Sequence, residues 1–295
     1  LLNPGGHYRY EGQTRQFPDT RLVWWAGGNP FHHHQDLNRL AEAWKKPDTI
    51  ICNEWCWNPM AKRADIVLPC TTHVERNDVS LSQRDSYIIR MEKAVNPPEN
   101  VRDDYEIFRN IARQMNIEPA FSEGRDADEW VRWIYGKTTV SDGKVGDLAS
   151  TELAKTSQND QTLNIPDWNE FCMAGWHKVD VPDKPRIMLE KFVSDPVANP
   201  LATPSGKIEI FSETVANFKY DDCLGHPIWR EPYEWIGNAG DEELHLISNQ
   251  PSTKLHSQLD QGAVSRAGKI DGREPVLLNP LDAVRRGITT GDVVR

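Results

Sequence analysis

The fold is decided by one stretch near the start of the chain, Arg21-Leu22-Val23-Trp24-Trp25-Ala26-Gly27-Gly28-Asn29-Pro30. Its apolar half, 21–26, has the length and composition of a buried strand, and the glycine pair with the Asn-Pro pair predicts a tight loop directly after it. Two more short apolar runs follow, at 48–53 and at 65–68. Continuous apolar runs of this length are typical of strands that are buried on both faces.

Helical segments alternate with these strands. Residues 34–46 place apolar side chains three and four positions apart, as one face of a helix does, and Pro47 ends the pattern. A shorter helix is predicted around 60–64, before the third strand. This alternation of strands and helices favours parallel pairing with helices on both faces. The predicted fold class is therefore α/β, with part of a doubly wound parallel sheet.

The rest of the chain divides into weaker signals. Helices are predicted over 103–115 and around 130–134, and an irregular, partly helical segment follows. Short strands are predicted at 206–211, 244–247, 274–278 and 292–295, with a short helix over 280–286. The later strands predict the beginning of a C-terminal β-barrel. The predicted domains are 1–118 (second half of an α/β domain), 119–240 (connecting segment) and 241–295 (start of the barrel).

Composition excludes some classes of protein. The 295 residues hold 34 Lys and Arg against 44 Asp and Glu, a net charge of −10, which argues against a nucleic-acid partner. No apolar run approaches the roughly 20 residues of a membrane span. We expect both ends to be cut, since the chain opens at Leu1 without an initiator methionine and stops where a strand is predicted to begin. We therefore expect a piece of a longer protein, with the compartment (periplasmic or cytoplasmic) left open.

The cysteines and histidines do not predict a metal site. Five cysteines are an odd number, and the Cys52–Cys56 pair lacks the second pair that a zinc site needs. In the run His32-His33-His34, consecutive side chains splay by about 100° on a helix, so the three cannot face one ion. One imidazole directed at a ligand oxygen is the alternative. We predict no metal ligand among these cysteines and histidines.

Several polar loops are candidates for ligand binding. The Gly27-Gly28 turn lets the backbone approach a phosphate or dinucleotide off the carboxyl end of a strand, although a plain left-handed turn explains it too. Glu54 or Asp65 can accept N–H groups of a base, and Asp65 also suits a turn or cap. The polar loop 250–258 and the charged loop 75–78 are either ligand contacts or solvated connections.

Several short segments with distinctive wording are spread over essentially the whole chain, at 24–36, 64–69, 75–78, 204–210, 255–258, 279–283 and 291–293. In this order they resemble the molybdopterin oxidoreductases of the dimethyl sulfoxide reductase family. The first segment is most similar to the S- and N-oxide reductases, such as biotin sulfoxide, trimethylamine N-oxide and dimethyl sulfoxide reductases.

This resemblance implies a molybdenum centre held by two molybdopterin guanine dinucleotides, which reduces an S-oxide or N-oxide by oxygen-atom transfer and releases water. The protein would orient the cofactor and shape access to it. The implied cofactor-binding residues are Gly28, Asn29, His33 (or His34 in the alternative register), Asn53, Glu54, Asp65, Gln250, His256, Ser257 and Gln258. A carboxylate suits guanine, because it accepts from both N1–H and the exocyclic amine.

The same resemblance implies what this sequence lacks. The family's protein ligand to molybdenum, and any iron–sulfur cluster, belong to an N-terminal portion that is not in this sequence, so the presence of a cluster stays open. We therefore expect no catalytic residue in these 295 residues, which alone should bind the cofactor weakly and be inactive. The electron donor, a cytochrome or reductase, is not identified. The alternatives are a family member acting on formate, nitrate or a hydroxylated aromatic, and a non-catalytic cofactor-binding α/β protein.

Overall fold

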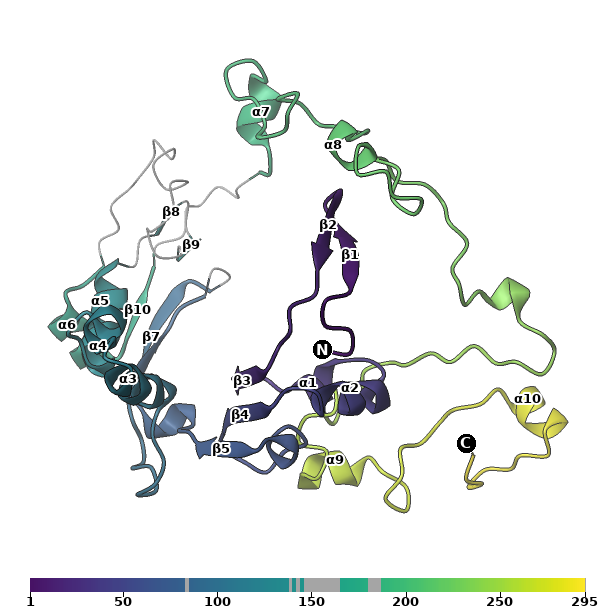
Figure 1. Ribbon diagram of the computed structural model, residues 1–295, viewed down its shortest axis with the longest axis horizontal. Coiled ribbons are helices and arrows are strands. Elements are labelled where there is room, and N and C mark those ends of the chain that lie inside the picture. The colour runs from purple at the N-terminus through teal and green to yellow at the C-terminus, as the bar shows by residue number, and fades with distance from the viewer. Residues whose placement is uncertain (83–84, 138–139, 142–143, 146–164, 180–186, 295) are drawn as a thin grey trace. The chain divides into compact units, whose positions relative to one another are not determined.

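A computed structural model describes residues 1–82, 85–137, 140–141, 144–145, 165–179 and 187–294 (Figure 1). The chain forms two compact units. The first unit comprises Leu1–Gly28 and Ala41–Ile228, and the second comprises Asn29–Leu40 and Trp229–Arg295. The three predicted domains divide the chain differently and stay a prediction.

A three-stranded parallel sheet is the centre of the first unit (Figure 1). Its strands lie in the order β3 (Leu22–Ala26), β4 (Thr49–Glu54) and β5 (Ile66–Pro69). Between them the chain forms α1 (Pro30–His33) and α2 (Leu37–Trp44), then the 3-10 turn η1 (Ala61–Arg63). The predicted succession of strands and helices, and the parallel pairing, are confirmed.

The two tryptophans of β3 cover opposite faces of this sheet, because successive side chains of a strand alternate. The ring of Trp24 lies 5.0 Å from that of Phe108, in helix α3 (Asp104–Gln114). The ring of Trp25 lies 6.0 Å from that of Trp44, at the end of α2. Helices therefore pack on both faces of β3, as the α/β prediction requires.

A second, antiparallel sheet carries a buried cluster of apolar side chains. It consists of β6 (Asp78–Ser80), β7 (Tyr87–Met91) and β10 (Trp176–Lys178), with β7 in the middle. Helices α5 (Ala127–Lys137) and α6 (Trp168–Ala174) complete it. The cluster consists of Ile88, Tyr135, Phe171 and Val179.

The remaining elements of the first unit are short. They are β1 (His7–Tyr10) and β2 (Gln13–Gln16), which form a hairpin, η2 (His73–Glu75), α4 (Glu118–Ser122), the strands β8 (Val140–Ser141) and β9 (Lys144–Val145), α7 (Glu190–Ser194) and α8 (Glu213–Ala216). Helix α4 is joined to α3 by Glu118, whose carboxylate accepts from Arg109 and Arg113 at 2.8 and 2.9 Å.

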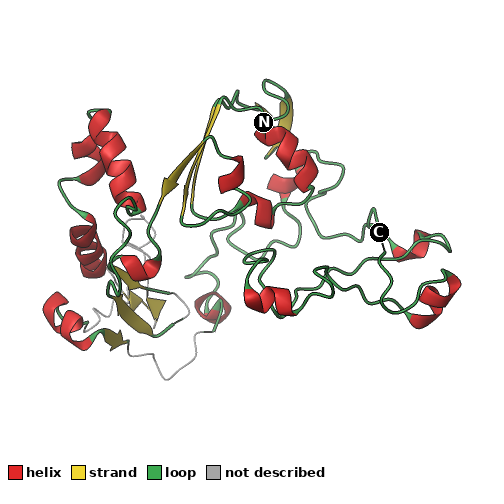
Figure 2. Cartoon of the chain, turned by 90° about the horizontal axis from the view of Figure 1, so that it is seen from below, coloured by secondary structure: helices red, strands yellow, loops and turns green. Residues whose placement is uncertain are grey.

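The second unit contains η4 (Ile236–Asn238), α9 (Ala263–Ala267) and α10 (Pro280–Arg285). The predicted helix before Gly287 is confirmed. The chain towards the C-terminus consists of loops and short helices (Figure 2), and no described residue from 187 to 294 belongs to a strand.

The predicted strands at 206–211, 244–247, 274–278 and 292–295 are therefore not found among the described residues, and a β-barrel is not confirmed. The first of these segments forms a turn instead, in which Thr203 Oγ1 donates to the Lys207 carbonyl at 2.6 Å. A strand is stable only when its backbone N–H and C=O groups pair with a neighbour. These apolar segments have no such partner here: Leu246 and Ile247 are each 78% exposed.

No helix among the described residues has the length and apolar character needed to cross a bilayer.

We predict that Phe171→Ala lowers the free energy of unfolding by about 3–5 kcal/mol, because its ring is fully buried and truncation removes its packing contacts and leaves a cavity. Met173→Ala, on the same helix but with its side chain 81% exposed, is the matched control and should change it by less than about 0.5 kcal/mol. Urea unfolding curves measure both. Equal effects would contradict the assignment of this core.

Candidate functional site

The glycine turn at the end of β3 has the backbone conformation predicted for it. Gly27 and Gly28 have φ values of +82° and +77°, in the left-handed region that residues with a Cβ rarely adopt. A Cβ at Gly27 would meet no atom within 4 Å, so the space beside this backbone is open. The Trp25 indole N–H donates to the Gly28 carbonyl at 3.0 Å and fixes the turn. The turn leaves a backbone surface accessible to a ligand.

Asn29 follows the turn and caps α1. Its Oδ1 accepts from the Phe31 amide at 3.0 Å, and the residue is 5% exposed. Its Nδ2 is buried and has no hydrogen-bond partner in the part of the chain that the structure describes. A buried donor left unpaired costs about 1–3 kcal/mol. This donor therefore fits a ligand oxygen.

Two segments far apart in the sequence meet in the second unit. The imidazole rings of His33 and His256 lie 4.8 Å apart at an interplanar angle of 76°. The Gln258 amide Nε2 lies 3.4 Å from His33 Nε2, across 225 residues of sequence. Three of the predicted cofactor-binding residues are thus brought together. His34, the alternative to His33, instead ends α1, where its backbone N–H donates to the Pro30 carbonyl at 2.9 Å.

Gln250 shapes the polar loop 250–258 from within. Its Nε2 donates to the Lys254 carbonyl, and its Oε1 accepts from the His256 amide at 3.3 Å. Ser257 is half-buried between His256 and Gln258. Both polar atoms of the Gln250 side chain therefore form hydrogen bonds within its own loop.

Asn53, at the end of β4, lies in a buried network. Its Oδ1 accepts from the Trp24 indole at 3.0 Å, and its Nδ2 donates to Asp104 Oδ1 at 2.7 Å. These bonds join β3, β4 and α3. The structure thus gives the Asn53 side chain a bonding role inside the first unit, and its predicted contact with the nucleotide stays a prediction.

The two candidate carboxylates lie at opposite ends of the strands of the parallel sheet. Glu54 ends β4 at the carboxyl edge and holds the following turn, since it accepts from the Trp55 amide at 3.0 Å and from Asn58 Nδ2 at 2.5 Å. Asp65 precedes β5 at the amino edge, where it accepts from the Ile50 amide at 2.7 Å. The sheet does not bring these two carboxylates together.

Thr71 was not found by the sequence reasoning. It follows β5 at the carboxyl edge, is 8% exposed, and its buried Oγ1 has no hydrogen-bond partner among the described residues. The only sequence signal was its place just after the strand and Pro69. Like Asn29, it offers an unpaired buried polar atom at the end of a parallel strand.

Two buried cysteines of the first unit, Cys52 and Cys70, have raised pKa values. Burial raises the pKa of Cys52 to about 11 and that of Cys70 to about 12, and nearby carboxylates add to both shifts. A metal ligand is a thiolate, so these thiols are poor ligands at neutral pH. No group of three or more His, Cys, Asp or Glu side chains in the described ranges is arranged to hold a metal ion.

The chain is similar to known proteins over its whole length. Residues 11–114 match the family profile "Molybdopterin oxidoreductase", and residues 244–295 match the profile of the molybdopterin dinucleotide binding domain. The chain is 45% identical over 295 residues to a biotin sulfoxide reductase of Cereibacter sphaeroides. It is 39% identical to a dimethyl sulfoxide/trimethylamine N-oxide reductase of the same organism and 39% identical to a trimethylamine-N-oxide reductase of Haemophilus influenzae.

These three alignments include all of this chain but only 38%, 34% and 34% of the relatives, so the chain spans about a third of their length. Among solved structures, acetylene hydratase from Pelobacter acetylenicus matches 94% of this chain and 33% of its own, with a TM-score of 0.61 and 20% identity. That likeness shows the fold alone.

The chain belongs to the molybdopterin oxidoreductase family. The two profile matches also confirm the predicted cofactor, molybdenum bis(molybdopterin guanine dinucleotide).

We predict that Cys52 and Cys70 react slowly with iodoacetamide at pH 8, while the exposed Cys223 is alkylated first. The raised pKa values keep both buried sulfurs protonated, so the rates at which they are alkylated should increase by about tenfold from pH 8 to pH 9. Peptide mass spectrometry measures the rates, and protein unfolded in urea is the control. Rapid alkylation of folded Cys70 at pH 8 would contradict the prediction.

Proposed function

We propose that this chain is part of an enzyme that reduces S-oxides or N-oxides. One observation carries the proposal: the chain aligns along its whole length with reductases of both substrate classes, at 45% and 39% identity. The match continues through both the parallel-sheet segment and the polar loop 250–258. The proposed substrate is a small S-oxide or N-oxide, and a separate electron donor, a cytochrome or reductase, completes the reaction.

The residues of the second unit fit the cofactor. Asn29 supplies a buried amide donor that has no partner within the described part of the chain. The side chains of His33, His256 and Gln258 contact one another and add ring nitrogens and an amide. Such groups suit phosphate and pterin oxygens. We propose that they contact the cofactor together with Ser257. For the first unit, we propose Gly28, Glu54 and Asp65 as cofactor-binding residues, with the two carboxylates directed at the ribose and guanine.

A bound molybdenum cofactor would supply the oxygen-atom chemistry. In the overall reaction the substrate would give up its oxygen as water, and the electron donor and solvent would provide the two electrons and two protons required. This chain's residues bind and orient: the glycine turn leaves the backbone accessible, and the histidines and glutamine hold the ligand by hydrogen bonds. Gln250 and Asn53 act indirectly in this proposal, because their side-chain amides already bond within the protein.

The C-terminal segment 241–295 is proposed to form the beginning of a β-barrel. Support comes from the match of 244–295 to a molybdopterin dinucleotide binding domain and from the exposed apolar side chains of 244–247 and 276–277. Neighbouring strands would pair with these segments and cover those side chains.

We predict that the enzyme expressed from its full reading frame, in a host that makes the molybdenum cofactor, oxidises reduced viologen when given S-oxides or N-oxides. The assay is a panel of both substrate classes, with nitrate and formate as comparisons. Turnover with nitrate or formate, and with no oxide, would contradict the proposed substrate class.

Gln258→Ala and His256→Ala should each reduce the guanine nucleotide retained by the full-length enzyme by roughly tenfold, since each removes one hydrogen-bonding group from the ligand. Nucleotide released by acid and quantified by chromatography gives the measurement. His245→Ala is the matched control, because His245 is an exposed histidine of the same unit outside the cluster. Equal loss in the control would contradict the assignment.

A further inference from the structure

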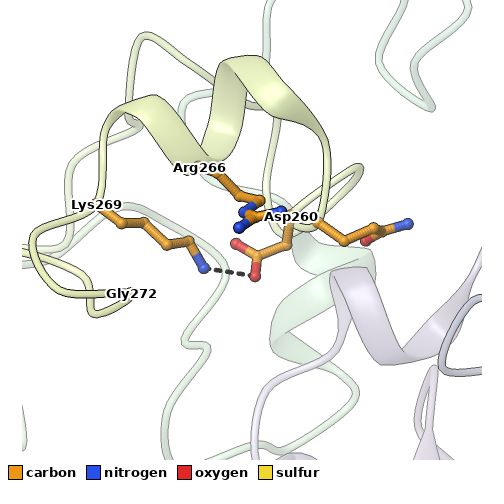
Figure 3. A pocket seen from close by; sticks show the side chains of 5 residues that line it. Asp260, Arg266, Lys269 and Gly272 are labelled. Carbon is orange, nitrogen blue, oxygen red and sulfur yellow. Dashed lines mark hydrogen bonds and ion pairs between the residues drawn. The ribbon is translucent and has the colours of Figure 1, made fainter.

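Four charged side chains form a closed ring of ion pairs in the second unit. Lys254 Nζ lies 2.7 Å from Asp260 Oδ1 and also donates to Glu274. Lys269 Nζ lies 2.6 Å from Asp260 Oδ2 and 3.5 Å from Glu274 Oε1. Figure 3 shows the Lys269–Asp260 contact beside a pocket of about 300 Å³, which Arg266 and Gly272 also line. Two positive and two negative charges balance in the ring.

The two lysine side chains of this ring are largely buried, which favours their ion pairs with the carboxylates. The side chains of Lys254 and Lys269 are only 9% and 15% exposed, whereas those of Asp260 and Glu274 are 42% and 52% exposed. An ammonium group removed from water is costly unless carboxylates pair with it. Hydrogen bonds to Asp260 and Glu274 raise the pKa of Lys254, so it stays charged at neutral pH. Lys254 is thereby held in one place.

The ring fixes both ends of the segment that carries His256 and Gln258. Lys254 and Asp260 are the two ends of this segment and are paired with each other. From Lys254 the connection continues through Gln250, which accepts from the His256 amide and donates to the Lys254 carbonyl. The ring and Gln250 therefore connect Lys254, His256 and Asp260 within one short segment.

The backbone of this segment needs such support. His256 and Leu259 both have φ values of +51°, in the left-handed region that residues with a side chain rarely adopt. A residue keeps this conformation only where its surroundings hold it. The ion pair between Lys254 and Asp260 restrains the backbone on both sides of His256 and Leu259.

We propose that Lys254 is a positioning residue, which through its ring with Asp260, Lys269 and Glu274 holds loop 250–258 in the shape that places His256 and Gln258 against His33. The inference rests on the proposed function for the ligand that this loop holds. Lys254 itself contacts neither substrate nor cofactor in this role.

The test uses the full-length enzyme with Lys254→Met, Lys254→Arg and Glu274→Gln. Arg286→Met is the matched control, because it breaks an ion pair of similar burial with Asp282 in α10 of the same unit. Two quantities are measured: hydrogen exchange of peptides from 250–258, read by mass spectrometry, and the rate at which guanine nucleotide is lost on dialysis. Glu274→Gln removes an exposed carboxylate of the same ring. It provides the test if the Lys254→Met enzyme accumulates poorly.

Lys254→Met should speed both the loop exchange and the nucleotide loss by about tenfold, and Glu274→Gln by about threefold. Lys254→Arg should restore both to within about twofold of the wild-type rates, because arginine reaches the same carboxylates. Arg286→Met should leave both unchanged. Loop exchange that is unchanged in Lys254→Met, or that rises equally in Arg286→Met, would overturn the inference.

The two proposals fail differently. A wild-type enzyme that holds no molybdenum and no guanine nucleotide would overturn the proposed function, while the loop exchange still decides whether the ring holds the loop. A loaded enzyme in which Lys254→Met keeps its nucleotide at the wild-type rate would overturn the positioning role and leave the proposed function standing.

Discussion

Parallel pairing of β3 with β4 and β5 is the constraint on which the first unit depends. Parallel strands cannot be joined by a hairpin, so each connection must return to the other end of the sheet before the next strand begins. The carboxyl ends of the three strands consequently lie on the same side of the sheet. The glycine turn follows Ala26 there, Glu54 ends β4, and Thr71 comes just after β5. The same pairing directs Trp24 and Trp25 to opposite faces, where separate helices cover them.

Much of this sheet could be predicted from the sequence because its signals are local. The predicted strands 21–26, 48–53 and 65–68 lie within one residue of β3, β4 and β5 at each end. Continuous apolar runs ended by glycine or proline are enough to specify buried strands. The strands predicted after residue 205 had similar local patterns, but a strand also needs a partner, and partners are not encoded in the segment itself.

The candidate site could be predicted only in part, for a related physical reason. Sequence motifs identified His33 and the loop 250–258. They did not show that the side-chain amides of Gln250 and Asn53 form hydrogen bonds within the protein. The ring around Lys254 was not found either. Which donor meets which acceptor depends on contacts between distant residues, whereas motif reading registers only residue types and spacing. Unpaired buried atoms, such as Asn29 Nδ2, become visible only when every neighbour is known.

The contact between His33 and Gln258 has a consequence for the order of events during synthesis. The two residues are 225 positions apart, and a ribosome adding about 5–20 residues per second needs roughly 10–45 seconds to pass from one to the other. During that interval the first segment exists without its partner. A ligand that contacts both segments can therefore be enclosed only after the second segment has emerged from the ribosome.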